Sequence, residues 1–198
     1  MNKGRYAMKN RIVETSIKLF DQKGFTATSI KDIVEVLNVT KGTFYYYFKS
    51  KQELLRDIHL NYIDDLIEQQ EKILGDEEKD CAEKLHGIIY MVISNIRTNK
   101  ESARIFFREM RHLSDKHVEE IRLKRNLFRK NYQNLIESGI RDGEFKTTIP
   151  ADMLTFGILG IMNWSYYWYN PDGDVSEEEL AVIFTDIILK GVKTPKLV

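Results

Sequence analysis

The sequence has 198 residues, of which 42% are hydrophobic and 30% are charged, and its formal net charge at pH 7 is zero. This composition is typical of a soluble globular protein with one domain, or with a small domain joined to a larger one, and it argues against a disordered chain. The single cysteine, Cys81, excludes an internal disulfide and a metal site built from paired cysteines, which fits a reducing compartment.

The sequence contains no segment that predicts export or membrane insertion. No apolar run follows the charged residues near the N-terminus, so we expect no secretory signal. The longest apolar stretch, at 156–164, is too short to span a bilayer. We therefore expect a cytoplasmic protein that does not bind membranes.

Charge is distributed unevenly along the chain. Residues 1–51 contain ten lysines and arginines against four acidic residues, so this segment carries +6 and residues 52–198 carry −6. A basic end on an acidic body is the pattern expected when one end of a protein binds a polyanion such as nucleic acid. A solvated basic surface is the alternative interpretation of the charge alone.

Three short helices are predicted in the first fifty residues. Apolar residues recur at helical spacing over 9–22. A second helix follows a cap at Thr28 or Ser29 and ends before a tight turn at Asn38-Val39, and a third helix ends near Phe48. Two short helices that are joined by a tight turn and braced by another helix form a helix-turn-helix.

The rest of the chain is predicted to be helical as well. A capping box at Ser50 and Glu53 begins a long helix over 51–74, and a second capping box at Ser176 and Glu179 begins the last helix. We therefore expect an all-α protein of about nine helices, with a DNA-binding domain at 1–52 and a second domain at 53–198. The later helices are expected at about 80–98, 101–111, 116–139, 151–169 and 176–193.

The third helix carries three adjacent tyrosines, which cannot all face one core because successive side chains on a helix are turned by about 100°. Phe44 and Phe48 are four residues apart and are expected to face inward, with Tyr45 and Tyr47 at the border. Tyr46 then points outward, where its ring can contact a thymine methyl group or a sugar. The alternative is that the tyrosines only pack on neighbouring helices. The outward group is predicted to be Lys41, Thr43 and Tyr46.

Phosphate contacts are expected around this helix. Gly42 allows the backbone to approach a groove closely, and Lys49 and Lys51 can hold phosphates as point charges. The helix N-termini near Thr28-Ser29 and near Lys51 present N–H groups that suit a phosphate.

These residues carry a resemblance to a known family. Positions 9–54, including GFTATSIKDIVEVLNVTKGTFYYYFKSKQELL, resemble the N-terminal domain of the TetR family of tetracycline-repressor-like regulators. Minor departures are Ile33-Val34, where Ile-Ala is usual, and Tyr47, where histidine is frequent. The resemblance implies that Lys41, Gly42, Thr43 and Tyr46 lie nearest the bases, with Thr28, Tyr45, Tyr47 and Lys51 on the DNA backbone.

The resemblance also implies an assembly and a mechanism. It implies a homodimer that binds a palindromic operator in double-stranded DNA, with dimer contacts from the helices at about 151–169 and 176–193. A ligand in the C-terminal domain would move the fourth helix and spread the two DNA-binding heads.

The segment GILGIMNWSYYWYNPDGDVSEEELAVIF allows two interpretations. Trp164 and Trp168 share one helix face, with Tyr167 beside them, and this aromatic face can form either a dimer interface or the wall of a ligand pocket. The segment is similar to TetR-family regulators of fatty-acid, acyl-CoA and steroid catabolism, whose effector is generally an acyl-CoA thioester. That similarity implies an apolar tunnel lined by Phe106, Phe107, Met110, Phe128, Met153, Phe156 and Met162.

Arginines are the candidates for binding the phosphates of coenzyme A. One predicted helix carries Arg104, Arg108 and Arg111. The next predicted helix carries Arg122, Arg125 and Arg129. The alternative is an ordinary solvated face on which these arginines pair with acidic residues. A lipophilic xenobiotic is the second candidate effector.

No catalytic or cofactor-binding pattern is found. The four histidines do not have the spacing of a metal site, and Glu109 and His112 lack the second Glu-x-x-His pair of a carboxylate metal centre. Cys81 lies in an acidic region away from any histidine, and no phosphate loop or nucleophile elbow is present. We therefore expect a regulator without metal or cofactor rather than an enzyme or a helical small-molecule carrier.

Overall fold

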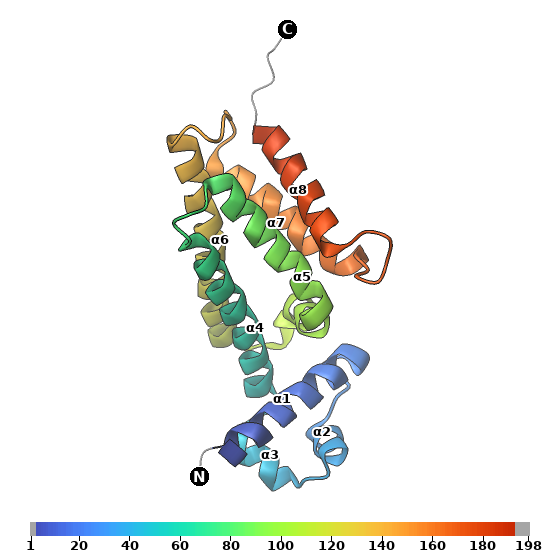
Figure 1. Ribbon diagram of the computed structural model, residues 1–198. Coiled ribbons are helices and arrows are strands. Elements are labelled where there is room, and N and C mark those ends of the chain that lie inside the picture. Colours follow the sequence, from blue (N-terminus) through green and yellow to red (C-terminus); the bar gives the residue numbers. More distant parts are fainter. Residues whose placement is uncertain (1–2, 193–198) are drawn as a thin grey trace. The chain divides into compact units, whose positions relative to one another are not determined.

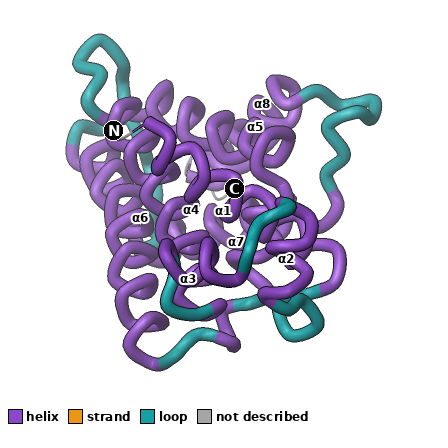
Figure 2. Tube along the Cα trace, turned by 90° about the horizontal axis from the view of Figure 1, so that it is seen from below, coloured by secondary structure: helices purple, strands orange, loops and turns teal. Residues whose placement is uncertain are grey.

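The computed structural model describes residues 3–192, and every regular element in this range is helical (Figures 1 and 2). The predicted all-α class is therefore confirmed. No helix in the described range is both long and apolar enough to cross a membrane. The elements are α1 (Lys3–Lys23), α2 (Ile30–Leu37), α3 (Lys41–Tyr47), α4 (Lys51–Leu74), α5 (Cys81–Arg108), a 3-10 turn (Met110–His112), α6 (Asp115–Arg141), α7 (Ala151–Trp168) and α8 (Glu177–Val192).

The chain divides into two compact units. Among the described residues, unit 1 comprises 3–63 and 101–123, and unit 2 comprises 64–100 and 124–192. Unit 1 contains the predicted helix-turn-helix, and unit 2 contains α7 and α8.

Local capping fixes the helix-turn-helix of unit 1. Ser29 caps α2: its Oγ accepts the Asp32 N–H at 3.1 Å, and the Asp32 carboxylate accepts the Ser29 N–H at 2.7 Å. Asn38 ends α2 in the left-handed conformation, with φ 53° and ψ 46°. Thr40 then caps α3 by accepting the Thr43 N–H at 3.2 Å. The tight turn expected at Asn38 is therefore confirmed.

Aromatic pairs form within α3 and between α1 and the turn that follows it. Phe44 and Phe48, both buried as predicted, have ring centroids 5.7 Å apart, and Phe20 meets Phe25 edge-to-face at 5.2 Å. Burial of each such ring stabilises the fold by roughly 1.5–3 kcal/mol relative to exposure. Other fully buried side chains of unit 1 are Ile12, Ile33, Leu54 and Leu55.

Unit 2 has an aliphatic core with three buried tyrosines, Tyr132, Tyr166 and Tyr169. Along α7, the residues at one face, including Ile158, Met162 and Tyr166, are buried, while the opposite face is exposed. Ring contact between Trp168 and Phe184, at 6.3 Å, joins α7 to α8. The largest fully buried side chains of unit 2 are Leu85, Ile88, Ile89 and Tyr132.

Two helices that the sequence predicts separately, at about 80–98 and 101–111, form one interrupted helix. α5 runs from Cys81 to Arg108, and the break falls at Asn99, whose φ of −129° and ψ of 24° are not helical. The Asn99 side chain donates to the Asn95 Oδ1 at 2.7 Å, which gives its amide a partner at the break. The two predicted helices are therefore confirmed on either side of this break, which falls between their predicted bounds.

The two predicted capping boxes differ in the structure. At the start of α8, Ser176 and Glu179 exchange both bonds, at 2.9 and 3.2 Å, so this box is confirmed. At the start of α4 only half of the box forms: the Glu53 N–H donates to Ser50 Oγ at 3.1 Å. The Glu53 carboxylate instead accepts the N–H of Lys49 at 2.5 Å, one residue earlier than predicted.

Candidate functional site

The outer face of α3 presents two tyrosines to solvent. Tyr46 is 61% exposed, and Tyr45 is 54% exposed, which is more than its expected place at the border of the core implies. Tyr47 is half-buried, and its ring meets the Tyr46 ring edge-to-face at 4.9 Å. Because Phe44 and Phe48 anchor the opposite face, the rotation of this helix about its axis is fixed. α3 therefore holds the Tyr46 ring outward on a rigid base.

The first turn of α3 is also accessible. Lys41 and Gly42 are exposed, and Thr43 is partly exposed. A Cβ atom added to Gly42 would lie 3.5 Å from Thr40 Oγ1, an ordinary contact, so the chain's own packing does not require glycine here. A requirement for glycine would have to come from something outside the chain, as a closely approaching DNA backbone would supply.

Lys51 has a structural partner that the sequence did not reveal. Its ammonium donates to the carbonyl oxygens of Phe25 and Thr28, both at 2.6 Å, and lies 4.3 Å from the centre of the Phe25 ring. Burial lowers the pKa of this lysine. The ammonium thus ties the turn between α1 and α2 to the start of α4. An ammonium has three N–H donors, so one remains for a phosphate.

The start of α2 is capped from within the chain. Thr28 is fully buried, and its hydroxyl donates to the Gly24 carbonyl at 2.9 Å, which closes the turn after α1. Ser29 is exposed, but its hydroxyl and its N–H both donate to the Asp32 carboxylate at 2.7 Å. These bonds hold the pKa of Asp32 below its ordinary value, so a negative charge already occupies this helix end.

The arginines predicted to bind coenzyme A phosphates lie in different surroundings. Arg104 forms a two-pronged ion pair with Asp21, with N–O distances of 2.7 and 2.5 Å, so its guanidinium already has an anion. Arg108 is exposed and lines a cleft of about 140 Å³ beside this pair. Arg111 is exposed, and its Nε lies 3.3 Å from Nε2 of His112. A phosphate could contact Arg104 only if the ion pair with Asp21 opened, and opening this pair requires free energy.

Two of the arginines on α6 also have described partners. Arg122 pairs with Glu119 at 2.7 Å on an exposed surface, as the solvated alternative predicts. Arg129 donates to Gln133 at 2.9 Å and lies 5.6 Å from the centre of the Phe156 ring. The exposed Arg122 pair contributes little stability because solvent screens it.

The residues predicted to line a tunnel do not share one environment. In unit 1, Phe106 is buried, and Phe107 and Met110 are half-buried. In unit 2, Phe128 and Met162 are buried in the core, and Met153 and Phe156 lie on the exposed face of α7. Unit 2 does contain a small apolar cavity of about 10 Å³, between Ile136, Phe145 and Ile158, but none of the predicted tunnel residues lines it.

One face of unit 2 is apolar and exposed. On α7 the exposed fractions are 54% for Phe156, 63% for Trp164, 52% for Tyr167 and 50% for Trp168. These side chains point away from the core of unit 2, so they form an outer surface and not an inner wall. The α8 residues Val182, Ile183 and Ile187, which were not predicted as site residues, are also exposed. The sequence could have indicated them, because the apolar residues of this helix cover more of its circumference than burial of one face requires.

No group of three or more potential metal ligands occurs within residues 3–192. Glu109 and His112 lie 3.3 Å apart, but His112 also stacks on Phe25 at 5.4 Å and so belongs to the packing of unit 1. Burial and the nearby Glu144 carboxylate raise the pKa of the Cys81 thiol to about 11, which keeps it protonated at neutral pH. A protonated thiol is a poor nucleophile, as expected from the sequence.

The family model described as "Tetracyclin repressor-like, C-terminal domain" matches residues 78–192, more than half of the chain. A second model, "Bacterial regulatory proteins, tetR family", matches residues 12–58, which include all of α2 and α3. The chain belongs to the TetR family. The resemblance seen in the first fifty residues is therefore confirmed, and it extends through the C-terminal part.

Individual TetR-family proteins are similar over nearly the whole chain. The HTH-type transcriptional repressor KstR2 of Rhodococcus jostii (strain RHA1) is 24% identical over 194 residues, which cover 97% of this chain and 94% of KstR2. The TetR-family regulator PfmR from Thermus thermophilus is 28% identical with a TM-score of 0.84, covering 93% of this chain and 100% of PfmR. Because these relatives are transcriptional regulators, they support the expectation that the chain is not an enzyme.

A further solved structure shares the TetR fold. It is the crystal structure of AibR in complex with isovaleryl coenzyme A and operator DNA, with a TM-score of 0.82 and 21% identity. The match covers 92% of this chain and 98% of AibR. At this identity the likeness shows the fold alone.

Proposed function

We propose that this TetR-family protein is a homodimeric repressor that binds a palindromic operator and is released from it by a lipophilic effector, a fatty acyl-CoA. The observation that carries the DNA-binding part is the outward face of α3, where Tyr46 is 61% exposed on a helix anchored by buried Phe44 and Phe48. In this proposal, residues 1–52 form the DNA-binding domain, and residues 53–198 bind the effector and dimerise.

The contacts to DNA divide into base contacts and phosphate contacts. Lys41, Gly42, Thr43 and Tyr46 enter the major groove from the first turns of α3. Phosphates are held by exposed Tyr45 and Lys49, together with half-buried Tyr47. Thr28, Ser29 and Lys51 support the contact surface through the bonds that fix the turn between α1 and α2, and the third N–H of Lys51 is available to the DNA backbone.

Replacement of Tyr46 by alanine tests the base contacts. We expect Tyr46→Ala to lower operator affinity by about tenfold to a hundredfold, because a contact to a base edge contributes roughly 1–3 kcal/mol of discrimination. Affinity for random DNA should change much less. The measurement is a binding titration on the protein's own upstream region and on a scrambled duplex, at one fixed salt concentration.

A matched control is Tyr90→Ala, which removes a tyrosine of unit 2 whose hydroxyl donates to Glu178 at 3.1 Å. The control should bind both duplexes as the unmodified protein does. If Tyr46→Ala lowers the affinity for operator and for random DNA equally, Tyr46 contacts the DNA backbone and not the bases. No loss on either duplex would show that α3 does not face DNA.

Dimerisation through α7 and α8 is supported by the apolar outer face of unit 2. A stable interface buries about 800 Å² per partner and is rich in tryptophan and tyrosine. Trp164, Tyr167 and Trp168 on α7, with Ile183 and Ile187 on α8, are all at least 46% exposed. A soluble protein is expected to cover such a face, and a second copy of the same chain covers it symmetrically.

An acyl-CoA effector is supported by the similarity of α7 and its following loop to acyl-CoA-responsive regulators. AibR, which has the same fold, has been crystallised with isovaleryl coenzyme A and operator DNA. Arg104, Phe107, Arg108, Met110, Arg111 and Phe128 remain the candidate effector contacts, together with Phe156, Trp164, Tyr167 and Trp168 if the effector reaches the outer face of α7. Contact with Arg104 requires its pair with Asp21 to open.

A panel of acyl-CoAs with different chain lengths tests the effector class. An effector at 100 times its dissociation constant should stabilise the protein by about 2.7 kcal/mol, measured as a rise in Tm, and should release it from the operator. Free coenzyme A and the matching free fatty acids serve as controls for the two halves of the ligand.

If a lipophilic drug shifts both measurements and no acyl-CoA does, the protein is a xenobiotic-responsive TetR regulator instead. If the protein binds a small molecule tightly or turns it over but binds no DNA in any ligand state, it is a carrier or an enzyme. Each result therefore selects one function.

A further inference from the structure

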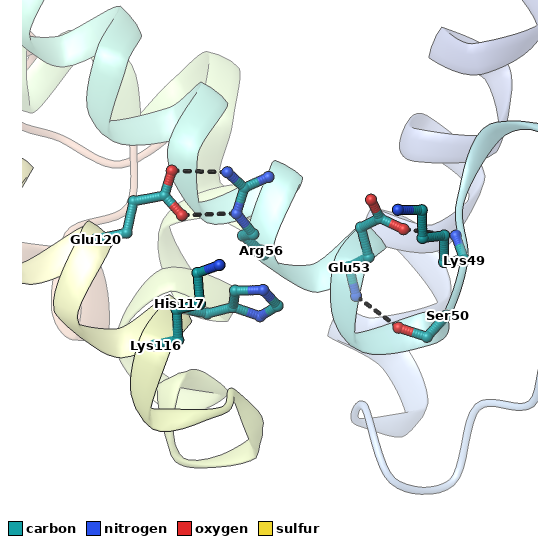
Figure 3. Close-up of a pocket in the computed structure, with 7 residues that line it drawn as sticks. All are labelled: Lys49, Ser50, Glu53, Arg56, Lys116, His117 and Glu120. Atoms are coloured by element: carbon teal, nitrogen blue, oxygen red, sulfur yellow. Dashed lines mark hydrogen bonds and ion pairs between the residues drawn. The ribbon is translucent and has the colours of Figure 1, made fainter.

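A polar cleft of about 360 Å³ lies within unit 1, between the turn that joins α3 to α4 and the first turns of α6 (Figure 3). At about 30 Å³ per water molecule it holds the volume of roughly a dozen waters, enough for a phosphate group and part of the molecule that carries it. Its charged and titratable lining residues are Lys49, Glu53, Arg56, Lys116, His117 and Glu120.

The arginine of the cleft is neutralised, but the lysines are not. Arg56 donates to both carboxylate oxygens of Glu120, at 2.7 and 2.6 Å, and this hydrogen bonding holds the pKa of Glu120 below its ordinary value. The ammonium groups of Lys49 and Lys116 have no ion pair within residues 3–192. Three cationic side chains against two carboxylates leave the cleft with a net positive charge.

His117 adds an unmatched polar atom. Its Nδ1 is buried and has no hydrogen-bond partner in the described part of the chain. In Figure 3 the imidazole projects from α6 into the cleft, and Lys49 approaches from the opposite side. Because Nδ1 is shielded from solvent, a molecule in the cleft would meet the other ring nitrogen, Nε2, which can donate or accept a hydrogen bond.

The N-terminal ends of two helices add partial positive charge to the cleft. α4 begins at Lys51 and α6 begins at Asp115, so the N-terminal ends of two long helices lie at the cleft. The first turn of α4 contains Glu53, and the first turn of α6 contains Asp115 beside Lys116 and His117. The partial positive charge of the two helix N-termini adds to the attraction of the two lysines for an anion in the cleft.

We propose that this cleft binds a phosphate group, which Lys49 and Lys116 hold by charge and His117 holds by a hydrogen bond. The phosphate belongs either to a small molecule in solution or to the backbone of operator DNA. The site is separate from the residues expected to bind the effector, so it does not depend on the effector's identity. Because Lys49 follows α3 and Lys116 begins α6, an occupant would connect these two elements within unit 1.

Thermal unfolding in inorganic phosphate tests the site, with chloride added to keep the ionic strength constant. If the cleft takes its phosphate from solution, phosphate should raise the Tm of the unmodified full-length protein. In Lys116→Gln/His117→Gln the same rise should need at least about tenfold more phosphate, since each lost contact is charge-assisted. Lys130→Gln, which removes an exposed lysine further along α6, should respond as the unmodified protein does.

Salt titrations of operator binding distinguish the two sources. If the operator supplies the phosphate, the slope of log K against log salt should fall by about one in Lys116→Gln but not in Lys130→Gln, and free phosphate should leave Tm unchanged. If a small molecule supplies it, Tm responds to phosphate, and the slope stays the same. The single variant Lys116→Gln changes only an exposed side chain and keeps His117. It should therefore fold normally even if the double variant does not. If phosphate leaves Tm unchanged and Lys116→Gln leaves the salt slope unchanged, the proposal is wrong.

Discussion

Replacement of Lys51 by methionine will lower the free energy of unfolding by about 2 kcal/mol, because it leaves two carbonyl oxygens without their donor. In the structure the Lys51 ammonium donates to Phe25 O and Thr28 O at 2.6 Å and lies over the Phe25 ring. Methionine preserves most of the apolar stem but has no N–H group. Chemical denaturation followed by circular dichroism measures the loss.

The matched control is Lys49→Met, two residues earlier, where the side chain is exposed. It removes the same charge, and we expect the free energy of unfolding to change by less than about 0.5 kcal/mol. Equal stability of the two variants would show that the Lys51 bonds contribute nothing to the fold.

Operator binding by Lys51→Met separates the two roles of this lysine. If Lys51 acts only by fixing the turn between α1 and α2, affinity falls while the slope of log K against log salt is unchanged. If its third N–H also contacts a phosphate, the slope falls by about one. Both outcomes are measurable in one salt titration, and they decide how the lysine assists DNA binding.

The helix-turn-helix could be predicted in detail because local sequence determines it. Capping side chains such as Thr40 act within three residues, and the spacing of Phe44 and Phe48 alone orients α3. The outward position of Tyr46 followed from this spacing without any tertiary information. The half-formed box at Ser50 shows the limit: the side chain of Glu53 reached one residue further than the motif predicts.

The partners of charged side chains could not be predicted, because they lie far apart in the sequence. Lys51 bonds to carbonyls 26 and 23 residues away, and Arg104 pairs with Asp21 across 83 residues. Backbone carbonyls leave no mark in the sequence, and an arginine in a basic stretch looks the same whether it binds a phosphate or an aspartate. Long-range pairing depends on the tertiary fold, which helical periodicity does not determine.

The aromatic residues of α7 illustrate a different limit. Helical spacing placed Trp164 and Trp168 on one face, but spacing alone cannot distinguish an inner wall from an outer surface. Once buried Ile158 and Met162 are known to occupy the core side, the tryptophans must lie outside. The orientation of this helix therefore places the tryptophans on the outer surface of unit 2, as the proposed dimer interface requires.

A double variant, Trp164→Asp/Ile187→Asp, is expected to convert the protein to a monomer. Both side chains are more than half exposed, so the isolated subunit should fold normally. In a symmetric dimer each substitution occurs twice and buries carboxylates that have no partner. A loss of about 2 kcal/mol per subunit raises the dimer dissociation constant about a thousandfold. Sedimentation velocity over a range of protein concentrations measures this shift.

Loss of the dimer should also reduce operator affinity by roughly a hundredfold to ten-thousandfold, because a monomer binds only one half-site and loses the effective concentration of the second head. Leu123→Asp is the matched control, since it places a carboxylate on a 61% exposed leucine of α6 in unit 1. This control should remain dimeric and bind the operator normally. A double variant that sediments like the unmodified protein at every concentration would place the interface on another surface. Monomers that still bound the palindrome at full affinity would show that the two half-sites are read independently.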